Sequence, residues 1–444
     1  MSNARQVALD LLLRVQNSDS YVNLLLPKVL EKNHVEDADR GFIQELSYGT
    51  LRWELQYDAI IDHFTPGKTL SPLLRTCLRM GLHQLFRMRV AVHAALNETV
   101  DLVKRHETSA AGLANAVLRN AERSGLEPLL ESLTENSGRL ESLSIIYSHP
   151  QWIVSSLLSA LELDGRQADL EAILSANNEV PQVNLAALSQ AAREQLNTLQ
   201  LEQGQASPIG FLAKGNLDRY LEIPGVRVQD QGSQLVALAL GKVADAGGKW
   251  LDMCAGPGGK AALLESLLED KPGDLTCYEP NPKRAELVRQ ALRQNGKTTV
   301  EVLSGQSAPI AQFDAILLDA PCSGLGSLRR KPEARWRKST DQLPQLTKLQ
   351  SELIDAAVAA LKPGGYLMYA TCSPVVAETN GQIRGALDRH PDMQLQDLPA
   401  TLKEISPNLE LNASRKTVQL WTHLHETDAM FMALLRKSRE NHAN

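Results

Sequence analysis

The chain has 444 residues and a formal net charge of −6, with 43% hydrophobic and 22% charged residues. This length exceeds what one hydrophobic core supports, so we expect two or three domains with the composition of an ordinary soluble protein. No apolar run reaches about 18 residues, and the first residues alternate charged and apolar side chains, which predicts neither a membrane span nor a signal peptide. The negative charge does not indicate nucleic-acid binding, so any such binding must depend on local basic patches.

The five cysteines are odd in number, lie far apart and include no C-x-x-C pair: they are Cys77, Cys254, Cys277, Cys322 and Cys372. This spacing argues against a disulfide framework and against a zinc site. It suits a reducing compartment, so we expect a cytoplasmic protein that holds no metal.

Residues 5 to 138 show helical periodicity, beginning with Val7, Leu11 and Val15, and contain no strand signal. The pattern predicts an all-helical domain over residues 1–138. Its arginines are closely spaced at Arg75, Arg79, Arg87 and Arg89, with Arg119 and Arg123 later. They predict either a solvated basic face or an RNA-contacting surface.

The segment 139–227 has a different pattern. A helix is expected near Pro150, and from Asn178 onward short alternating runs are broken by proline and glycine, which predicts a small α+β domain. From residue 228 to 444, apolar strands alternate with helices, which predicts a mostly parallel, doubly wound α/β sheet. The longer helices expected there are Pro282 to Asn295, Leu343 to Leu361 and Glu378 to Arg389.

The stretch WLDMCAGPGGK, Trp250–Lys260, is predicted to form a strand, a tight loop and the start of a helix. A helix that opens directly after a strand points unpaired N–H groups at a ligand above the loop. Gly256, Gly258 and Gly259 allow such a ligand to touch the backbone, and Pro257 stiffens the loop.

Two known phosphate-binding loops do not match this spacing. A P-loop requires Ser or Thr after its lysine, where this chain has Ala261, and a dinucleotide fingerprint requires G-x-G-x-x-G. The loop therefore favours a nucleoside-like ligand without phosphates, and Glu279 after the next strand is placed to bind ribose hydroxyls. A purely structural strand-to-helix turn is the alternative.

Four groups of residues follow strands of the predicted sheet: the loop at Gly256, Glu279, Asp319 to Cys322, and Thr371 to Cys372. Ligands bind at the carboxyl ends of strands in such sheets, so we expect these groups to share one crevice. A single cysteine is most often a buried structural thiol, and Cys77 and Cys277 keep that interpretation. Two cysteines at strand ends beside a nucleoside site favour chemistry instead.

The motifs LDMCAGPGGK, LLDAPCSGLG and YATCSP together resemble those of the S-adenosylmethionine-dependent RNA cytosine-5 methyltransferases, the Sun/NOL family. The helical N-terminus, the SHPQW segment and the extension DAPCSGLGSLRRKPEARW are most similar to the bacterial members that act on 16S ribosomal RNA. The resemblance implies a NusB-like RNA-binding domain (1–138), an RRM-like or ferredoxin-like unit (139–227) and a Rossmann-like methyltransferase domain (228–444). It implies a monomeric enzyme that takes a single-stranded or loop cytosine and needs neither membrane nor metal.

Cytosine methylation explains why two thiols would be needed. Carbon 5 becomes a nucleophile once a thiolate has added to carbon 6, and cysteine suits that addition because part of it ionises near neutral pH. The resemblance assigns the nucleophile to Cys372 and product release to Cys322. It also implies that Asp319 faces the ring nitrogen and amino group of the pyrimidine, and that Lys260 supports the pocket electrostatically.

The resemblance also implies the residues that hold S-adenosylmethionine. The methionine part would lie against Cys254, Ala255, Gly256, Pro257, Gly258, Gly259 and Lys260, close to Asp319. Glu279 would hold the ribose, with Arg284 nearby. The family has Gly-Asp after the third strand, where this chain has Gly305 and Gln306, so we expect a different adenine contact. The family's C-terminal Asp-Gly-Phe-Phe is altered at residues 428–431, which affects the expected local backbone shape.

Substrate contact is expected at a stretch that we call the basic segment, Arg329–Lys338. Its basic side chains could bind phosphates and its tryptophan could stack on a base; the candidates are Arg329, Arg330, Lys331, Arg335, Trp336 and Arg337. A solvated charged loop is the alternative. The target carbon is hindered in a stacked helix, so we expect a base turned out of a loop or bulge.

Two other functions are compatible with the sequence. A transfer RNA cytosine-5 methyltransferase would use the same chemistry, but the NusB-like N-terminus favours ribosomal RNA by resemblance. An RNA-binding ribosome assembly factor with weak or no activity is favoured only by Gln306. The two cysteines, Asp319, Lys260 and the glycine loop favour an active enzyme.

Overall fold

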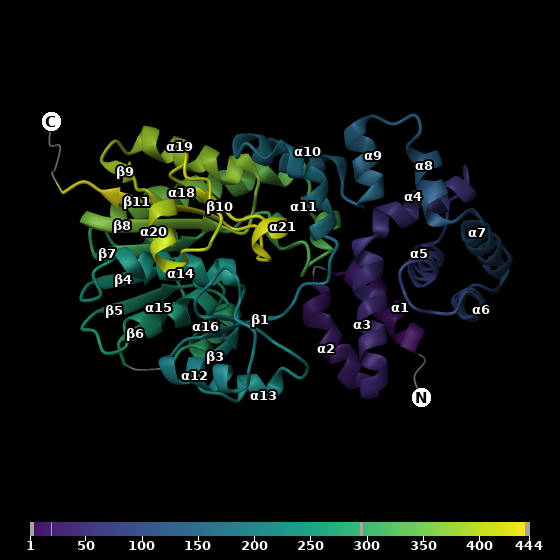
Figure 1. The fold of residues 1–444 in the computed structure, drawn as a ribbon, viewed down its shortest axis with the longest axis horizontal. Coiled ribbons are helices and arrows are strands. Elements are labelled where there is room, and N and C mark those ends of the chain that lie inside the picture. Colours follow the sequence, from purple (N-terminus) through teal and green to yellow (C-terminus); the bar gives the residue numbers. More distant parts are fainter. Residues whose placement is uncertain (1–3, 19, 294–295, 440–444) are drawn as a thin grey trace. The chain divides into compact units, whose positions relative to one another are not determined.

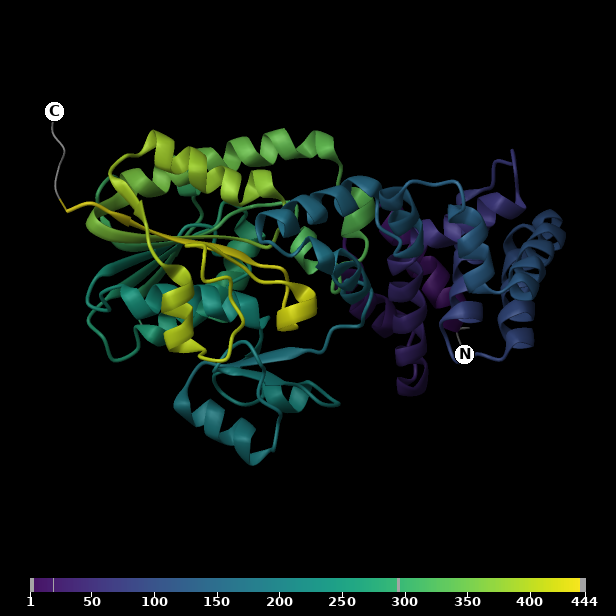
Figure 2. The ribbon, with the colours of Figure 1, turned by 45° about the horizontal axis from the view of Figure 1, so that its top comes forward.

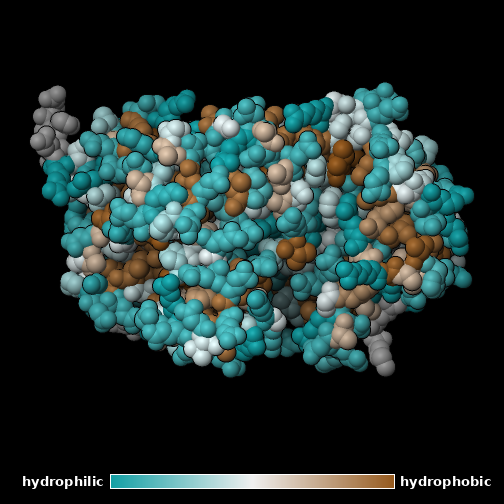
Figure 3. Space-filling view, in the orientation of Figure 1, coloured by the Kyte–Doolittle hydropathy of each residue, from teal (hydrophilic) through white to brown (hydrophobic). Residues whose placement is uncertain are grey.

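The computed structural model describes residues 4–18, 20–293 and 296–439, drawn in Figure 1. The chain forms two compact units. The first consists of Met1–Leu158, Ala168–Glu179 and Leu328–Arg337, and the second of Ser159–Gln167, Val180–Ser327 and Lys338–Asn444. No helix of the described residues is both long and apolar enough to span a bilayer. On the face drawn in Figure 3, hydrophobic residues lie scattered among hydrophilic ones.

The N-terminal part of the first unit is all-helical, as expected. Val7, Leu11 and Val15 recur on one face of the first helix and are buried in a single core with residues of the following helices. Ser71 caps one of these helices by accepting the backbone N–H of Leu74. The helices are α1 (Ala4–Gln16), α2 (Val22–Lys32), α3 (Asp37–Arg52), α4 (Glu54–Phe64), α5 (Pro72–Phe86), α6 (Val92–His106), α7 (Ala111–Ser124), α8 (Leu126–Thr134), α9 (Arg139–Ile146), α10 (Gln151–Leu163) and α11 (Leu170–Ala176).

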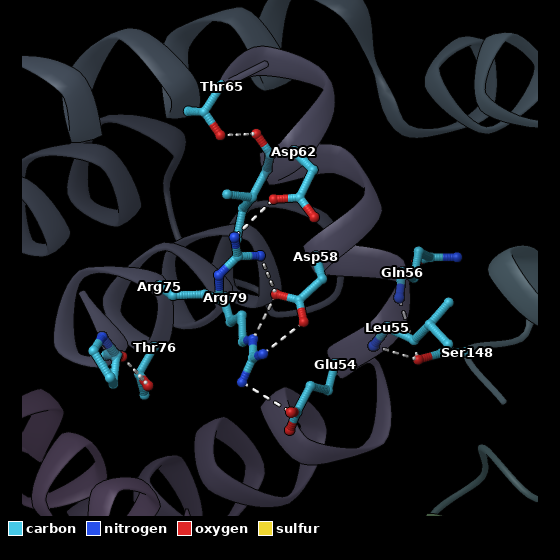
Figure 4. Close-up of polar contacts among 12 residues, drawn as sticks. Glu54, Leu55, Gln56, Asp58, Asp62, Thr65, Arg75, Thr76, Arg79 and Ser148 are labelled. Carbon is cyan, nitrogen blue, oxygen red and sulfur yellow. Dashed lines mark hydrogen bonds and ion pairs between the residues drawn. The ribbon is translucent and has the colours of Figure 1, made fainter. Parts of the chain in front are cut away.

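Two of the closely spaced arginines belong to an internal ion-pair network between α4 and α5 (Figure 4). Arg79 forms a bidentate pair with Asp58 at 2.8 and 2.6 Å and a further contact with Glu54 at 2.9 Å. Arg75 bridges Asp58 and Asp62 at 3.1 and 2.7 Å. Arg79 is buried, so its charge is used in ion pairs inside the unit. The prediction of a basic face is therefore wrong for Arg75 and Arg79.

The basic segment contains α17 (Ala334–Arg337), and its first nine residues belong to the first unit. Arg335 is fully buried and its guanidinium donates to four acceptors at 2.7 to 3.0 Å: the carbonyls of Arg52, Ser148 and Asn177 and the side-chain oxygen of Asn178. Burial, helped by the nearby Arg52, lowers the pKa of Arg335. The expected RNA contact of Arg335 is therefore wrong, because its donors are used inside the protein.

Other side chains of the basic segment are anchored in the same unit. The Trp336 indole donates to the carbonyl of Leu51 at 2.7 Å. Arg337 donates to three carbonyls, one in the last turn of α1, at Val15, and two after this helix, at Ser18 and Ser20. Arg329 is buried, whereas Arg330 is exposed and Lys331 is half-buried. Contact with RNA stays a prediction for Arg330 and Lys331, and it is not supported for the anchored residues.

Replacing Arg335 by alanine should destabilise the first unit by about 3 kcal/mol or more, because buried acceptors would lose their charged donor. This loss is measured by urea unfolding of the full chain, with amide hydrogen exchange in α3 as the readout for the first unit. Arg119→Ala is the matched control, since Arg119 is an exposed arginine of the same unit. Equal stability of the two variants would contradict the structural assignment.

A small three-stranded antiparallel sheet lies in the segment that was expected to be α+β. Leu185 and Phe211 form a core with Leu196 of the adjoining helix. The strands have the order β2-β1-β3, and this sheet belongs to the second compact unit. The elements are β1 (Asn184–Ala187), α12 (Gln190–Thr198), β2 (Gly210–Leu212), α13 (Asp218–Leu221) and β3 (Val226–Val228).

The large sheet of the second unit has the strand order β10-β11-β8-β7-β4-β5-β6, with β9 paired to β11. Five neighbouring strands are parallel, namely β8, β7, β4, β5 and β6. The antiparallel pairs of β9, β10 and β11 lie at the β8 end of the sheet. The strands are β4 (Lys249–Asp252), β5 (Asp274–Tyr278), β6 (Thr298–Glu301), β7 (Phe313–Asp319), β8 (Leu361–Thr371), β9 (Met393–Leu395), β10 (Val418–Gln419) and β11 (Phe431–Lys437).

Helices cover both faces of this sheet, as Figures 1 and 2 show. Trp250 and Leu317 pack in one core with α14 and α15, while their neighbours Leu251 and Leu318 pack in the other with α18 and α19. The helices are α14 (Gln231–Val243), α15 (Gly259–Leu267), α16 (Pro282–Ala291), α18 (Leu343–Ala360), α19 (Asn380–Arg389), α20 (Leu398–Ile405) and α21 (Thr422–His425). The doubly wound prediction is confirmed. The helix expected to reach Asn295 ends at Ala291, and Asn295 lies outside the described residues.

The strand order places the predicted site residues at one edge of the sheet. Strands β8, β7, β4 and β5 are successive parallel neighbours, so their carboxyl ends lie together. Asp252 pairs in register with Leu317, and Asp319 with Ala370. The residues that follow these strands therefore lie at the carboxyl edge of the same sheet.

Candidate active site

The glycine loop joins β4 to α15 through a backbone that leaves no room for a side chain at two of its glycines. A Cβ on Gly256 would lie 2.2 Å from Oε2 of Glu279. Gly258 has a φ of +106°, and a Cβ there would lie 2.6 Å from the Cβ of Ala291 in α16. Glycine is required at both positions, by close approach at Gly256 and also by the left-handed backbone at Gly258.

Glu279 follows β5 and is buried beside this loop. Its Oε1 accepts the backbone N–H of Asn281 at 3.0 Å, and its Oε2 lies 3.4 Å from Nη2 of Arg284. Arg284 donates from the same nitrogen to the carbonyl of Gly256 at 2.7 Å. The structure therefore brings Glu279 and Arg284 to the glycine loop, where Arg284 stabilises the loop backbone.

Gln306 lies in a 3₁₀ turn (Gly305–Ser307) after β6 and is exposed. Its amide donates to Glu352 of α18 at 2.8 Å. The backbone of Gly305 approaches the end of β4 closely, since a Cβ there would lie 2.6 Å from Cγ of Met253. The turn is thus near the glycine loop, but the Gln306 side chain is engaged with α18. Its expected contact with adenine stays a prediction.

Lys260 and Asp319 form an ion pair at the carboxyl ends of the strands. Nζ of Lys260, in the first turn of α15, lies 2.7 Å from Oδ2 of Asp319 at the end of β7 and 2.8 Å from Oγ of Ser233. Burial alone would lower the pKa of Lys260, but the Asp319 carboxylate outweighs it and the pKa is raised. Lys260 also lies close enough to Cys372 to interact with it electrostatically.

Asp252 is a site residue that the sequence interpretation missed. It ends β4 and is buried, and its carboxylate accepts no side-chain hydrogen bond from the described residues. Burial, followed by repulsion from Asp319 and partly offset by Lys260, raises its pKa to about 7. Its only sequence signal was its position at the end of the apolar run before the loop.

The raised pKa of Asp252 makes stability depend on pH in the cofactor-free protein. In the unfolded chain this carboxyl ionises near 3.8, whereas in the folded protein it keeps its proton to about pH 7. Its contribution is fully present at low pH and is lost as pH rises through that range, by up to about 4 kcal/mol. Asp252→Asn cannot ionise, so its unfolding free energy relative to wild type should increase between about pH 5 and pH 8. Urea unfolding across that range tests this, and a constant difference would contradict it.

The two predicted cysteines follow neighbouring strands of the sheet. Cys322 follows β7 and Cys372 follows β8, and these two strands are adjacent and parallel. The N–H of Gly326 donates to the carbonyl of Cys372 at 3.0 Å. A Cβ on Gly326 would lie 2.3 Å from the carbonyl oxygen of Ala429, so this contact requires glycine.

The surroundings of the two thiols differ. Burial, with the charges of Glu378 and Asp319, raises the pKa of Cys322 to about 12, so this thiol keeps its proton at neutral pH. The Cys372 sulfur lies 3.7 Å from Oδ2 of Asp428, to which it donates. Asp428 was considered only for backbone shape in the sequence, yet its carboxylate contacts the predicted nucleophile.

The other three cysteines do not follow β7 or β8. Cys77 and Cys277 are fully buried, as expected for structural thiols. Burial raises the pKa of each of them and also that of Cys254, beside the glycine loop. All five cysteines of the chain are free thiols.

Comparison with known protein families places both parts of the chain. Residues 239–436 match the family model of the 16S rRNA methyltransferase RsmB/F, and residues 2–123 match that of the NusB family. The chain is similar to the solved structure of PH0851, with a TM-score of 0.77 and 22% identity over 98% of this chain and 99% of that one. A methyltransferase homolog from Pyrococcus horikoshii has a TM-score of 0.54 and 22% identity, over 68% of this chain and 99% of that one. These matches confirm the NusB-like and methyltransferase folds.

Sequence relatives extend over nearly the whole chain. Rv1407 of Mycobacterium tuberculosis, to which a methyltransferase activity is ascribed, is 39% identical over 98% of this chain and 96% of its own length. The ribosomal RNA small subunit methyltransferase B of Yersinia pseudotuberculosis is 33% identical over 92% of this chain and 95% of its own. The chain therefore belongs to the RsmB/F family of 16S rRNA methyltransferases.

Proposed function

We propose that this protein transfers a methyl group from S-adenosylmethionine to carbon 5 of a cytosine in 16S ribosomal RNA, through a covalent bond between Cys372 and carbon 6. The observation that carries this proposal is the pair of free thiols at adjacent parallel strand ends, beside the Lys260–Asp319 ion pair. A single buried thiol could be explained by packing alone. Two cysteine loops held together beside a Lys–Asp ion pair favour a catalytic function instead.

The residues around the glycine loop fit S-adenosylmethionine. This cofactor supplies an electrophilic methyl group on a positively charged sulfur when it is bound. Gly259 has room beside its backbone, since the nearest atom to a Cβ there would be Nε2 of Gln229 at 3.8 Å, and three acidic side chains lie nearby, at Asp252, Glu279 and Asp319. Glu279 pairs with Arg284 and Asp319 with Lys260, whereas Asp252 forms no ion pair among the described residues. Three acidic side chains thus face two basic ones, which suits a cationic ligand with ribose hydroxyls and no phosphate.

Cys372 performs the first chemical step in this proposal. Its sulfur forms a bond to carbon 6 of cytosine, and the displaced electron pair makes carbon 5 nucleophilic toward the methyl group. Asp428, whose Oδ2 accepts from the sulfur, is placed to receive the thiol proton. The positive charge of Lys260 favours the thiolate, and Asp319 is assigned to the ring nitrogen and amino group of the base.

Cys322 acts after methyl transfer. Carbon 5 then carries both the methyl group and a proton, and loss of that proton breaks the bond from carbon 6 to Cys372. We assign assistance in this step to Cys322, because it follows the strand next to that of Cys372. Its raised pKa keeps the thiol protonated at neutral pH, so it assists by donating a hydrogen bond to the departing Cys372 sulfur while the carbon 5 proton passes to water.

A methylation assay with isotopically labelled cofactor tests the proposal. Purified protein is incubated with unmodified 16S ribosomal RNA and, separately, with transfer RNA, and the digested nucleosides are analysed. Label in 5-methylcytidine from ribosomal RNA is the expected result. Label on another atom or base would refute cytosine-5 chemistry, and label only in transfer RNA would favour the tRNA enzyme. Failure to bind cofactor would favour an RNA-binding assembly factor.

A further inference from the structure

A buried carboxylate that the chemistry above does not use connects the two cysteine loops. Glu378 ends a 3₁₀ turn (Val376–Glu378) after β8 and is fully buried. Its Oε1 accepts the backbone N–H of Ser323 at 2.7 Å and the amide of Gln350 at 3.1 Å. Its Oε2 accepts the hydroxyls of Ser323 at 2.5 Å and Ser373 at 2.6 Å.

The residues that Glu378 binds are the immediate neighbours of the two thiols. Ser323 follows Cys322 and Ser373 follows Cys372, and the two serine hydroxyls lie 3.0 Å apart. One carboxylate therefore holds both cysteine loops directly. We call this arrangement the Glu378 bridge.

The surrounding structure fixes the Glu378 bridge in place. Gln350 of α18 donates to Glu378 and also to the carbonyl of Pro321, which precedes Cys322. The Tyr369 hydroxyl donates to the backbone carbonyl of Glu378 at 2.7 Å. No lysine or arginine forms an ion pair with Glu378 within the described ranges. Hydrogen bonds alone compensate its burial, so each of them matters for its position.

We propose that Glu378 is a positioning residue that sets the Cys322 loop against Cys372, and thereby controls how efficiently the methylated RNA leaves the enzyme. The inference rests on the proposed cysteine chemistry. A glutamine at this position has the same shape, but its NH2 group only donates. Where it replaces Oε1 it cannot accept from the Ser323 N–H and the Gln350 amide, and where it replaces Oε2 it cannot accept from the two serine hydroxyls. One loop would shift, and small displacements between reacting groups are costly: about 1 Å can reduce a rate by about 10²-fold.

Glu378→Gln should change the partition between trapped and released RNA. The enzyme is mixed with cofactor and RNA containing ordinary cytosine, and RNA that remains attached in a denaturing gel is compared with released methylated RNA. We expect the attached-to-released ratio to rise by about 10-fold. Each preparation is normalised to active enzyme by trapping with 5-fluorocytosine RNA. A purely structural effect would lower the amount of active enzyme and leave this ratio unchanged.

Glu265→Gln is the matched control. Glu265 is also a buried glutamate of the second unit that accepts a backbone N–H, from Arg293 at 2.7 Å, but it does not contact either cysteine loop. Its ratio should equal that of wild type. Ser373→Ala removes a single donor of the bridge and should give an intermediate ratio, so the test holds even where Glu378→Gln fails to fold.

A second readout does not require RNA. Loss of the Glu378 charge should make the Cys322 thiol ionise more readily. Alkylation of Cys322 by iodoacetamide should therefore be several-fold faster in Glu378→Gln than in wild type, and mass spectrometry measures this rate. If the wild-type protein traps 5-fluorocytosine RNA but Glu378→Gln changes neither the attached-to-released ratio nor the rate of Cys322 alkylation, the Glu378 proposal alone is overturned. A wild-type protein that traps no RNA would instead overturn the cysteine mechanism.

Discussion

Replacing Cys372 by alanine should abolish methyl transfer, with a loss of more than about 10³-fold in kcat, and remove every covalent complex with 5-fluorocytosine RNA. Alanine has no atom that can bond to carbon 6, so carbon 5 stays a poor nucleophile however well the cofactor binds. The substitution removes one half-buried sulfur beside Asp428, which should cost only about 1 kcal/mol of stability. Labelled-methyl transfer and gel-stable adducts measure the two effects.

Two controls separate loss of the nucleophile from loss of structure. Cofactor binding by Cys372→Ala, measured by calorimetry, should stay within a few-fold of wild type, because the glycine loop follows a different strand. Cys77→Ala removes a buried thiol of the first unit and should keep full activity. An adduct that persists in Cys372→Ala would show that another residue, with Cys322 as the first candidate, forms the bond.

Most strands of the large sheet could be predicted because they carry a local signal, whereas the three-residue β9 was not expected. Apolar runs alternate with helical periodicity from Trp250 onward, and a parallel sheet brings the residues after such strands to one edge. Asp319, Cys322 and Cys372 follow from that rule alone, and the structure places them there. Which cysteine forms the bond does not follow from it, because adjacent strand ends are equivalent in sequence.

The basic segment shows what local composition cannot reveal. Arg335 donates to the carbonyls of residues 52, 148 and 177. Because these acceptors are distant in sequence, the residues next to Arg335 give no sign that it is buried. Arg79 is similar, since its carboxylate partners lie on a different helix. A run of arginines predicts charge, and the fold decides whether that charge faces solvent or binds internal acceptors.

The missed acidic residues have the same explanation. Asp252, Asp428 and Glu378 each act on residues that are close in space but far away in the chain. Glu378 lies only six positions after Cys372, yet its second partner, Ser323, is 55 positions away. A carboxylate that joins two loops is recognised only when both loops are placed.

Replacing Cys322 by alanine should leave the enzyme attached to its product. Cys372 would still form its bond and methylation would still occur once, but loss of the carbon 5 proton would be slowed by about 10² to 10⁴-fold. Rapid-quench measurement should show one methyl group transferred per enzyme, followed by almost no turnover, with RNA retained in a denaturing gel. Uninterrupted turnover without retained RNA would contradict the assignment of Cys322.

The double variant Cys322→Ala/Cys372→Ala makes this assignment specific. If attachment passes through Cys372, the double variant should retain no RNA, although it lacks the residue assigned to release. A merely misfolded Cys322→Ala would give neither the single burst of methylation nor the complex. The burst, the retained RNA and its disappearance in the double variant therefore order the two thiols, with Cys372 forming the bond and Cys322 acting only after methyl transfer.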